Sequence, residues 1–169
     1  YEEFNTAAEV CKVLKNMGYE VGINLMQTSE QSKEKILSIS KIAHDAKPDV
    51  LYFADSLGSM LPLGISNLIS NLRSHWRGPI GIHAHDNLKK AIDNTLQAIN
   101  ENVNWVDSTV TGMGRGPGNV QTEYLLIEME NIKKKKINIL PLLKLIKKYF
   151  EPLKNKYEWG TNTYYYMSG

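Results

Sequence analysis

Residues 80–87 read IGIHAHDN, and this short segment carries the clearest fold signal in the sequence. It begins apolar and ends polar, which is typical of a strand buried in a parallel sheet. The turn signal Gly78-Pro79 stands directly before it. Apolar residues then recur at helical spacing from Leu88 to Ile99, so the sequence predicts a strand followed by a helix.

The same alternation extends in both directions along the chain. Three more short apolar segments predict strands, namely Tyr19–Met26, Val50–Ala54 and Trp105–Val110. Apolar stripes at helical spacing fill the remaining segments and predict helices around residues 4–17, 36–46, 65–76 and 88–99. A fifth predicted helix begins near Val120 and ends near the basic run Lys133–Lys136. For the second of these helices, Ser29 is the expected N-cap and Glu30 is expected in the first turn.

Strands that alternate with helices at intervals of about 25–30 residues indicate βα units in a parallel α/β sheet. Four such units are half of a (β/α)8 barrel, which takes about 250 residues in all; a small open doubly wound sheet is the alternative. We expect the βα units in residues 1–131 and a helical tail in residues 132–169. In a half-barrel, Tyr19–Met26 and Trp105–Val110 would each have an unpaired edge, which predicts self-association as a homo-oligomer.

The composition excludes several classes of protein. Lys and Arg number 20 and Asp and Glu number 18, so a net charge of +2 gives no electrostatic argument for nucleic acid or an anionic membrane as partner. No apolar run approaches the roughly 18 residues of a membrane-spanning helix. The single cysteine, Cys11, cannot form an internal disulfide, which fits a reducing compartment such as the cytoplasm. Because the chain opens at Tyr1 without a Met, we expect it to be a piece of a longer protein.

Polar residues collect where the predicted strands end, which is the ligand side of such folds. His83 and His85 are two residues apart, so a strand would place both imidazoles on one face, where they could share a divalent metal. The alternative is a pair of hydrogen-bonded polar residues at the mouth of a barrel. Asp55 and Asp107 are either partners that orient the histidines or simple polar residues at strand ends.

A glycine-rich segment follows the last predicted strand, with glycines at positions 112, 114, 116 and 118. Glycine allows a positive φ and close backbone approach, so this loop could hold an anion at the N-terminus of the next helix. It could equally be a tight turn without a ligand. The GxGxGxG spacing does not match the GxGxxG pattern of dinucleotide-binding proteins.

The segment Gly81–Asn119 closely resembles the metal-dependent pyruvate aldolases of the 4-hydroxy-2-oxovalerate aldolase type. Their wider family includes hydroxymethylglutaryl-CoA lyase, isopropylmalate synthase and homocitrate synthase. The shared pattern is HxH on one strand and G-[MI]-G-x-x-x-G-N after the next, and the similarity runs from about Tyr19 to Glu130. The resemblance implies a (β/α)8 barrel with HxH on its seventh strand. The four predicted strands would then be strands five to eight, the C-terminal half of the barrel.

The resemblance also implies roles for particular residues. His83 and His85 would be metal ligands, and Asn119 matches an Asn that joins the metal site in the lyase and the synthases. The loop residues expected on the substrate side are Gly112, Gly114, Arg115, Gly116 and Gly118. Arg115 stands where the aldolases have a small residue and the synthases an acid. One tyrosine of Tyr164, Tyr165 and Tyr166 would be functional, or all three would be packing residues.

The implied function is that of a lyase, an aldolase that cleaves or forms a carbon–carbon bond next to a 2-oxo acid through an enolate bound to Mn²⁺ or Mg²⁺. The family's third ligand, an Asp, and its catalytic Arg belong to a D-x-x-x-R-D-G motif that these 169 residues lack. We therefore expect an N-terminal half-barrel of the same protein to complete the site. The alternatives are an acyl-CoA-dependent Claisen synthase, which the Glu-free GMGRGPGN loop disfavours, and a non-catalytic (βα)4 binding or assembly module.

Overall fold

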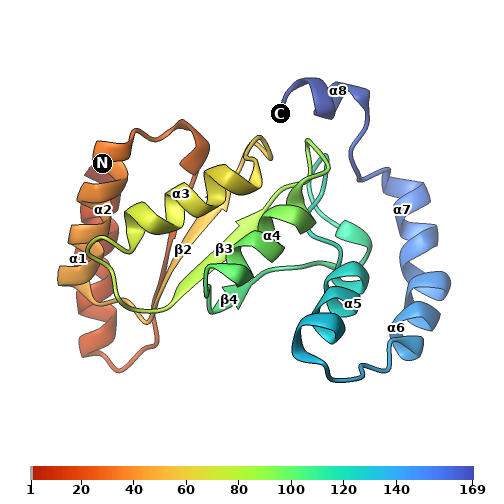
Figure 1. The fold of residues 1–169 in the computed structure, drawn as a ribbon, viewed down its shortest axis with the longest axis horizontal. Helices are drawn as coiled ribbons and strands as arrows, with labels where there is room; N and C mark the ends of the chain where they lie inside the picture. The colour runs from red at the N-terminus through yellow and green to blue at the C-terminus, as the bar shows by residue number, and fades with distance from the viewer. Residues whose placement is uncertain (1) are drawn as a thin grey trace.

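The computed structural model describes residues 2–169 and contains one four-stranded parallel sheet (Figure 1). The strands, in the order β1-β2-β3-β4, are Gly22–Leu25, Val50–Asp55, Ile80–Ala84 and Trp105–Val106. Every neighbouring pair is parallel. The predicted α/β fold with consecutive parallel βα units is therefore confirmed, and β1 and β4 are the two edges of the described sheet.

Helices connect the strands and form the tail of the chain. The connecting helices are α1 (Glu2–Asn16), α2 (Lys33–Ala46), α3 (Pro62–Leu72), α4 (Ala91–Asn100) and α5 (Thr122–Lys133). The tail holds α6 (Leu140–Leu145), the π-helical segment η3 (Ile146–Phe150), α7 (Glu151–Tyr157) and α8 (Thr163–Met167). Within residues 2–169, none of these helices combines the length and the apolar character needed to cross a membrane.

The core lies between one face of the sheet and the connecting helices. Leu51 and Phe53 of β2 and Ile80 and Ile82 of β3 are fully buried there. Side chains alternate between the two faces of a strand, so Tyr52 and His83 belong to the opposite face. In Figure 1, α3 and α4 cross in front of the sheet, while α5 and the tail helices lie beside it. The helix layer therefore fixes which face of the sheet is free for a site.

Two strands are shorter than the sequence predicts. β1 begins at Gly22 instead of Tyr19, and the N–H of Val21 donates to the Asp49 carboxylate rather than to a ladder partner. β4 ends at Val106 instead of Val110, because the chain then turns and the N–H of Thr109 donates to the carbonyl of Val120. Asp107 and Ser108 therefore follow β4 directly instead of lying on it.

The expected N-cap of the second helix is wrong. Ser29 and Glu30 lie in a short 3-10 turn, η1 (Thr28–Glu30), and α2 begins only at Lys33. The N-cap is Ser32, whose hydroxyl accepts from the N–H of Lys35 at 3.3 Å. Both serines can cap a helix. The extended backbone of Gln31 separates the 3-10 turn from α2, and so the later serine caps the helix.

The tail is helical, as expected, and it returns to the carboxyl ends of the strands. The indole N–H of Trp159 donates to the carbonyl of Thr111, and the hydroxyl of Thr161 donates to the carbonyl of Asn87. Figure 1 shows α8 next to the loops at these strand ends. The expected boundary after residue 131 falls in the last turn of α5, and the division into two domains stays a prediction.

Candidate metal centre

Strand register brings the candidate residues to one face of the sheet. Tyr52 on β2 is level with Gly81 on β3, and Gly81 is level with Trp105 on β4. His83 is two residues beyond Gly81, and Asp107 is two residues beyond Trp105. A shift of two residues keeps a side chain on the same face, so the imidazole and the carboxylate meet there.

His83 and His85 lie next to each other. Their ring centroids are 5.1 Å apart, and the ring planes are inclined by 79°. Both residues are half-buried. β3 ends at Ala84, and His85 continues it through an isolated antiparallel bridge to Asn119. The structure therefore brings together the three residues named as ligands by resemblance, and their role as metal ligands stays a proposal.

Asp107 orients the His83 ring. Its Oδ2 lies 3.0 Å from His83 Nδ1. A carboxylate can only accept, so this contact assigns the ring proton to Nδ1 and leaves the lone pair of Nε2 for another partner. The carboxylate–histidine pair is the arrangement that orients histidines in metal sites. The other carboxylate oxygen, Oδ1, accepts from the Tyr52 hydroxyl at 3.2 Å.

The surroundings of His85 favour its neutral form. Burial lowers the pKa of His85, and the nearby His83 and Arg115 lower it further. Each of these effects disfavours a positive charge on the imidazole. A neutral imidazole is the form that binds metal ions, so the site holds His85 in its ligand form over a wider range of pH.

Asn119 supplies the observation that bears most directly on a metal. Its side-chain oxygen, Oδ1, is buried and has no hydrogen-bond partner among the described residues. Its amide nitrogen donates to the carbonyl of Met113 at 3.4 Å. An unpaired buried carbonyl oxygen costs free energy unless something binds it, and an amide oxygen is a suitable ligand for a hard divalent cation.

The residues present fit a divalent cation but form an incomplete set. All three ligands are neutral: the two imidazoles suit a transition-metal ion, and the amide oxygen suits a cation such as Mn²⁺ or Mg²⁺. Among residues 2–169, no cluster of three or more His, Cys, Asp and Glu side chains could hold a metal ion.

Asp55 serves the loop after β2 instead of the histidines. Its carboxylate accepts from the backbone N–H groups of Ser59 and Met60, both at 3.1 Å, and the residue is fully buried. Burial raises the pKa of Asp55, although these hydrogen bonds act in the opposite direction. Of the two interpretations left open for Asp55, a structural residue at a strand end is the one that its contacts fit.

The glycine loop is a tight turn. Three of its N–H groups donate to backbone carbonyls close by: Gly112 to Thr109, Gly118 to Arg115 and Asn119 to Gly112. A Cβ on Gly118, where φ is +79°, would lie 2.2 Å from the carbonyl oxygen of Gly112. These three N–H groups are therefore not free to hold an anion, and Gly112 and Gly118 allow the turn that places Asn119 opposite His85.

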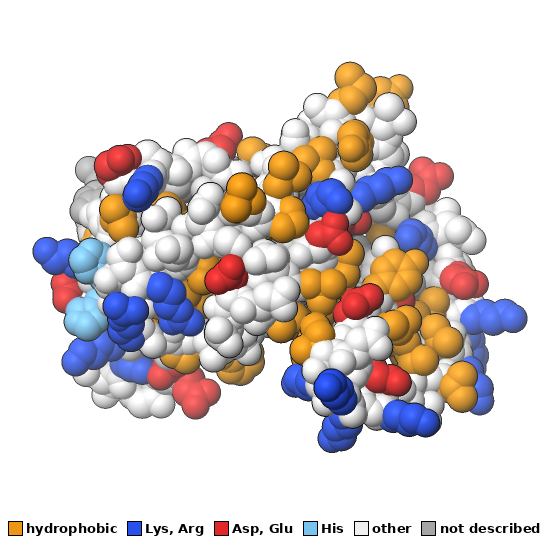
Figure 2. All heavy atoms as spheres, in the orientation of Figure 1, with side chains coloured by type: hydrophobic (Ala, Val, Ile, Leu, Met, Phe, Trp, Pro, Cys, Tyr) orange, Lys and Arg blue, Asp and Glu red, His pale blue; other side chains and the backbone are white. Residues whose placement is uncertain are grey.

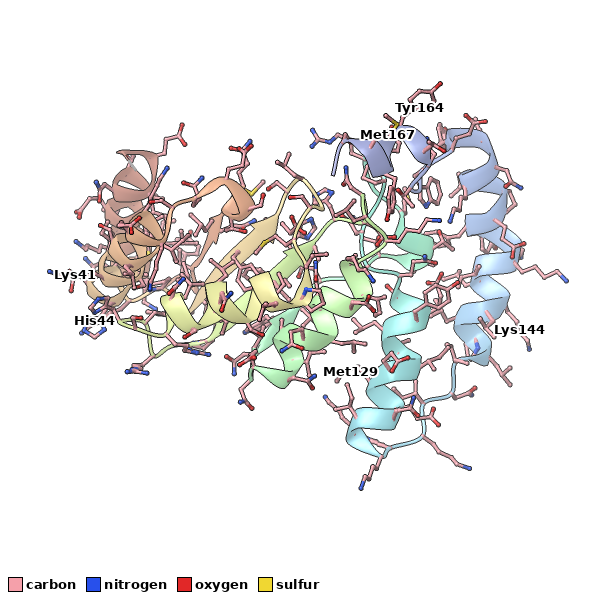
Figure 3. All side chains as sticks on the ribbon, turned by 45° about the horizontal axis from the view of Figure 1, so that its top comes forward. Lys41, His44, Met129, Lys144, Tyr164 and Met167 are labelled. Atoms are coloured by element: carbon pink, nitrogen blue, oxygen red, sulfur yellow. The ribbon has the colours of Figure 1, made fainter. Side chains whose placement is uncertain are left out.

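The three consecutive tyrosines are in different environments. Tyr164 is 83% exposed and Tyr166 is 54% exposed, and Figure 3 shows Tyr164 at the outer side of α8. Tyr165 is half-buried, and its ring and hydroxyl lie over Gly116 in the glycine loop. Asn87, after β3, donates to the backbone carbonyl of Tyr165 at 3.5 Å. Tyr165 is therefore the one of the three tyrosines that the structure places against the glycine loop.

A cleft of about 490 Å³ lies on the other side of the glycine loop, between α5 and the tail. Asn119, Thr111 and Trp159 are among its lining residues, whereas His83 and His85 are not. Figure 2 shows hydrophobic side chains gathered over α5 and the tail helices on this face. Asn119, which bridges to His85, and Asp86, which follows His85, are the lining residues next to the histidine pair.

Sequence analysis missed Tyr52. Its strand segment, VLYFA, is almost continuously apolar, and nothing within the segment singles out the phenol. The available signal was periodicity combined with register. Tyr52 points to the same face of β2 as Ala54, which is level with His83. Tyr52 also lies level with Gly81 on the next strand, and the absence of a side chain there leaves room for the tyrosine ring.

Curated proteins similar to this chain are 4-hydroxy-2-oxovalerate aldolases. The aldolase of Pelotomaculum thermopropionicum is 37% identical over 128 residues, which are 76% of this chain and 38% of that protein. The aldolase of Brevibacillus brevis is 33% identical over 130 residues, 77% of this chain and 38% of that protein. The chain thus spans well under half the length of these curated relatives.

Solved structures share the fold. The N-terminal domain of a proposed aldolase from Bacteroides vulgatus superposes with a TM-score of 0.87 at 36% identity, covering 96% of this chain and 54% of that one. The HMG-CoA lyase of Bacillus subtilis superposes with a TM-score of 0.77 at 17% identity, covering 97% and 58%. A family model described as HMGL-like matches residues 2–147. With its parallel βα units and its HxH pair beside a glycine turn, the chain belongs to the HMGL-like family.

Proposed function

We propose that this chain carries part of the active site of a divalent-metal-dependent aldolase, a lyase that breaks or forms a carbon–carbon bond next to a 2-oxo acid. The proposal rests on one arrangement above all. His83 is oriented by Asp107, and the unpaired Oδ1 of Asn119 lies in the residue that bridges to His85. Family membership and the names of the curated relatives support the reaction class.

Each residue has a proposed task. His83, through Nε2, and His85 bind the cation, which is Mn²⁺ or Mg²⁺ by resemblance, and Asn119 adds its amide oxygen. When bound, the cation supplies Lewis-acid chemistry that stabilises negative charge on the 2-oxo acid. Asp107 holds the His83 ring in its ligand orientation, and Asp55 keeps the loop after β2 in place.

The substrate and the rest of the site belong to the proposal as well. The 2-oxo acid is an anion, and the exposed Arg115 is a cation on the same loop as Asn119. An N-terminal half-barrel of the same protein supplies the acidic ligand, the catalytic arginine and the remaining wall of the barrel. The homo-oligomer and the cytoplasmic location stay predictions.

Tyr165 is the proposed functional tyrosine. It is the least exposed of the three. A Cβ added at Gly116 would lie only 3.4 Å from its hydroxyl, so the phenol lies against the loop that carries Asn119. A phenol in this position can donate a proton or a hydrogen bond to a substrate held by the histidines. Asn87 and Thr161 hold the tail that carries it.

The decisive experiment is His83→Ala in the full-length protein. Pyruvate release from a 4-hydroxy-2-oxo acid is measured with Mn²⁺ or Mg²⁺ present, and Mn²⁺ affinity is measured separately by titration. We expect a loss of turnover of about 10³-fold or more and a large loss of Mn²⁺ affinity, because a directly bound ligand acts on the transition state through the cation.

The matched control is His44→Ala. His44 is exposed on α2, and Figure 3 shows it at the far end of the molecule from α8. Its replacement should change neither the rate nor the affinity. If His83→Ala retained turnover close to that of His44→Ala, the metal assignment would be wrong and a non-catalytic module would become the better interpretation.

A further inference from the structure

Tyr52 reaches across the sheet to the candidate metal centre. It lies on β2, whereas the carboxylate that its hydroxyl contacts belongs to Asp107, directly after β4. The whole of β3 separates the two strands. The side chain therefore spans one complete strand to make a single hydrogen bond of 3.2 Å.

Gly81 makes this crossing possible. It lies level with Tyr52 on the neighbouring strand, and a Cβ there would come within 2.5 Å of the tyrosine ring. Any other residue at position 81 would occupy the space of the ring. Two independent features, a tyrosine in an apolar strand and a glycine opposite it, thus serve the same contact.

The hydrogen bond has a defined direction. Burial raises the pKa of Tyr52 to about 12, with smaller contributions from the charge of Asp107 and from the hydrogen bond itself. The phenol therefore stays protonated at neutral pH and donates to Oδ1. The opposite oxygen, Oδ2, contacts Nδ1 of His83. Both carboxylate oxygens of Asp107 are engaged, so the carboxylate cannot rotate without breaking one contact.

We propose that Tyr52 is a positioning residue that fixes the Asp107 carboxylate and, through it, the orientation of the His83 imidazole toward the cation. This inference rests on the proposed function, since it needs His83 to bind a metal. Asp107 is 45% exposed at its side chain, so without the phenol the carboxylate would be free to turn toward solvent. In this proposal Tyr52 restricts the orientation of His83 through Asp107 and touches neither the substrate nor the metal.

The test is a double-mutant cycle on Mn²⁺ affinity in the full-length protein. Replacing a residue that supports a metal ligand lowers metal affinity by about 10- to 100-fold, and we expect Asp107→Ala to lower Mn²⁺ affinity within that range. Tyr52 acts one contact further out, so Tyr52→Phe should weaken binding by about 3- to 10-fold. In the Asp107→Ala background, Tyr52→Phe should cost less than about 2-fold, because its partner is gone.

Two further measurements separate positioning from general stability. The ¹⁵N shifts of the metal-free protein report the His83 tautomer, and Tyr52→Phe should reduce the fraction with its proton on Nδ1. Tyr19→Phe is the matched control, because Tyr19 is 60% exposed before β1. It should leave the affinity, the tautomer and the melting temperature unchanged.

Three results would overturn the proposal. The first is a Tyr52→Phe variant that binds Mn²⁺ as tightly as the wild type. The second is a loss of Mn²⁺ affinity on Tyr52→Phe that is equally large with Asp107 present and with Asp107 replaced by Ala. The third is a His83 tautomer that Tyr52→Phe leaves unchanged. His83→Ala in the same titration tells the two levels apart. If His83→Ala loses Mn²⁺ and Tyr52→Phe does not, the role of Tyr52 alone is refuted; if His83→Ala binds normally, the proposed function falls with it.

Discussion

Asp55 and Asp107 follow the same rule of sequence, since each comes where a parallel strand ends, yet they have opposite environments. Asp55 is fully buried, and its carboxylate is used by two N–H groups of its own loop. Asp107 is far more exposed, and it binds side chains from two other strands. One carboxylate holds a loop, and the other holds a candidate metal ligand.

Strand parity explains the difference. Asp55 is level with Ala84, and Ala54 is level with His83. Asp55 therefore points to the face opposite the histidines, whereas Asp107 has the parity of Gly81 and His83. The comparison teaches that an acidic residue at a strand end is a candidate for a site only if its register places it on the face of the other ligands.

The largest effect that we expect on this comparison is a loss of stability in Asp55→Ala. The substitution leaves the N–H groups of Ser59 and Met60 without their acceptor in a buried place. The free energy of unfolding should fall by about 2–4 kcal/mol, because a buried N–H left without an acceptor costs roughly 1–3 kcal/mol and the two losses do not add fully. Urea unfolding measures it. Mn²⁺ affinity that fell as far as in Asp107→Ala would contradict the division of roles.

The Asp55 effect should also depend on pH. The pKa of Asp55 is raised in the folded state, so folding is favoured when the group is protonated. That contribution is fully present below the unfolded pKa, about 3.9, and is lost as the pH rises through the folded pKa. The destabilisation by Asp55→Ala should therefore be larger at about pH 4.5 than at pH 7. A difference that grew with pH would show that the sign is wrong.

Asp107→Ala should show the opposite profile. Its carboxylate contacts His83 and supports little of the core, so the free energy of unfolding should change by no more than about 0.5 kcal/mol. Mn²⁺ affinity should fall by about 10- to 100-fold, as expected for a carboxylate behind a metal-binding histidine. Isothermal titration and urea unfolding on the same preparation give both numbers. A loss of stability as large as that of Asp55→Ala would contradict the different roles assigned to the two carboxylates.

The smallest effect concerns Arg115, on the exposed loop after β4. Arg115 is the last of three causes that lower the pKa of His85, after burial and His83. Arg115→Gln in the metal-free protein should raise the pKa of His85, and solvent screening should keep the change small. NMR titration of the imidazole checks it. The His44 resonance serves as internal control, and a downward shift for His85 would contradict the proximity of the two charges.

Local sequence predicted much of the fold. The apolar segments at β2 and β3 and the alternation with helices were sufficient for a parallel α/β sheet, and HxH at a strand end was sufficient for two adjacent imidazoles. These predictions succeed because they depend on periods of two or 3.6 residues within one element. The ends of elements were less accurate: Ser32 rather than Ser29 caps α2, and β4 ends before Asp107.

Local sequence patterns are sufficient to predict the kinds of element, their order and the candidate site residues. Which of these residues meet depends on contacts between distant segments. The register between strands sorted Asp107 toward His83 and Asp55 away from it, and a glycine on a neighbouring strand gave Tyr52 its path. The return of the tail placed Tyr165, of three adjacent tyrosines, against the glycine loop. The physical reason is that contacts between distant segments depend on how strands pair and helices pack, and no local period encodes that pairing.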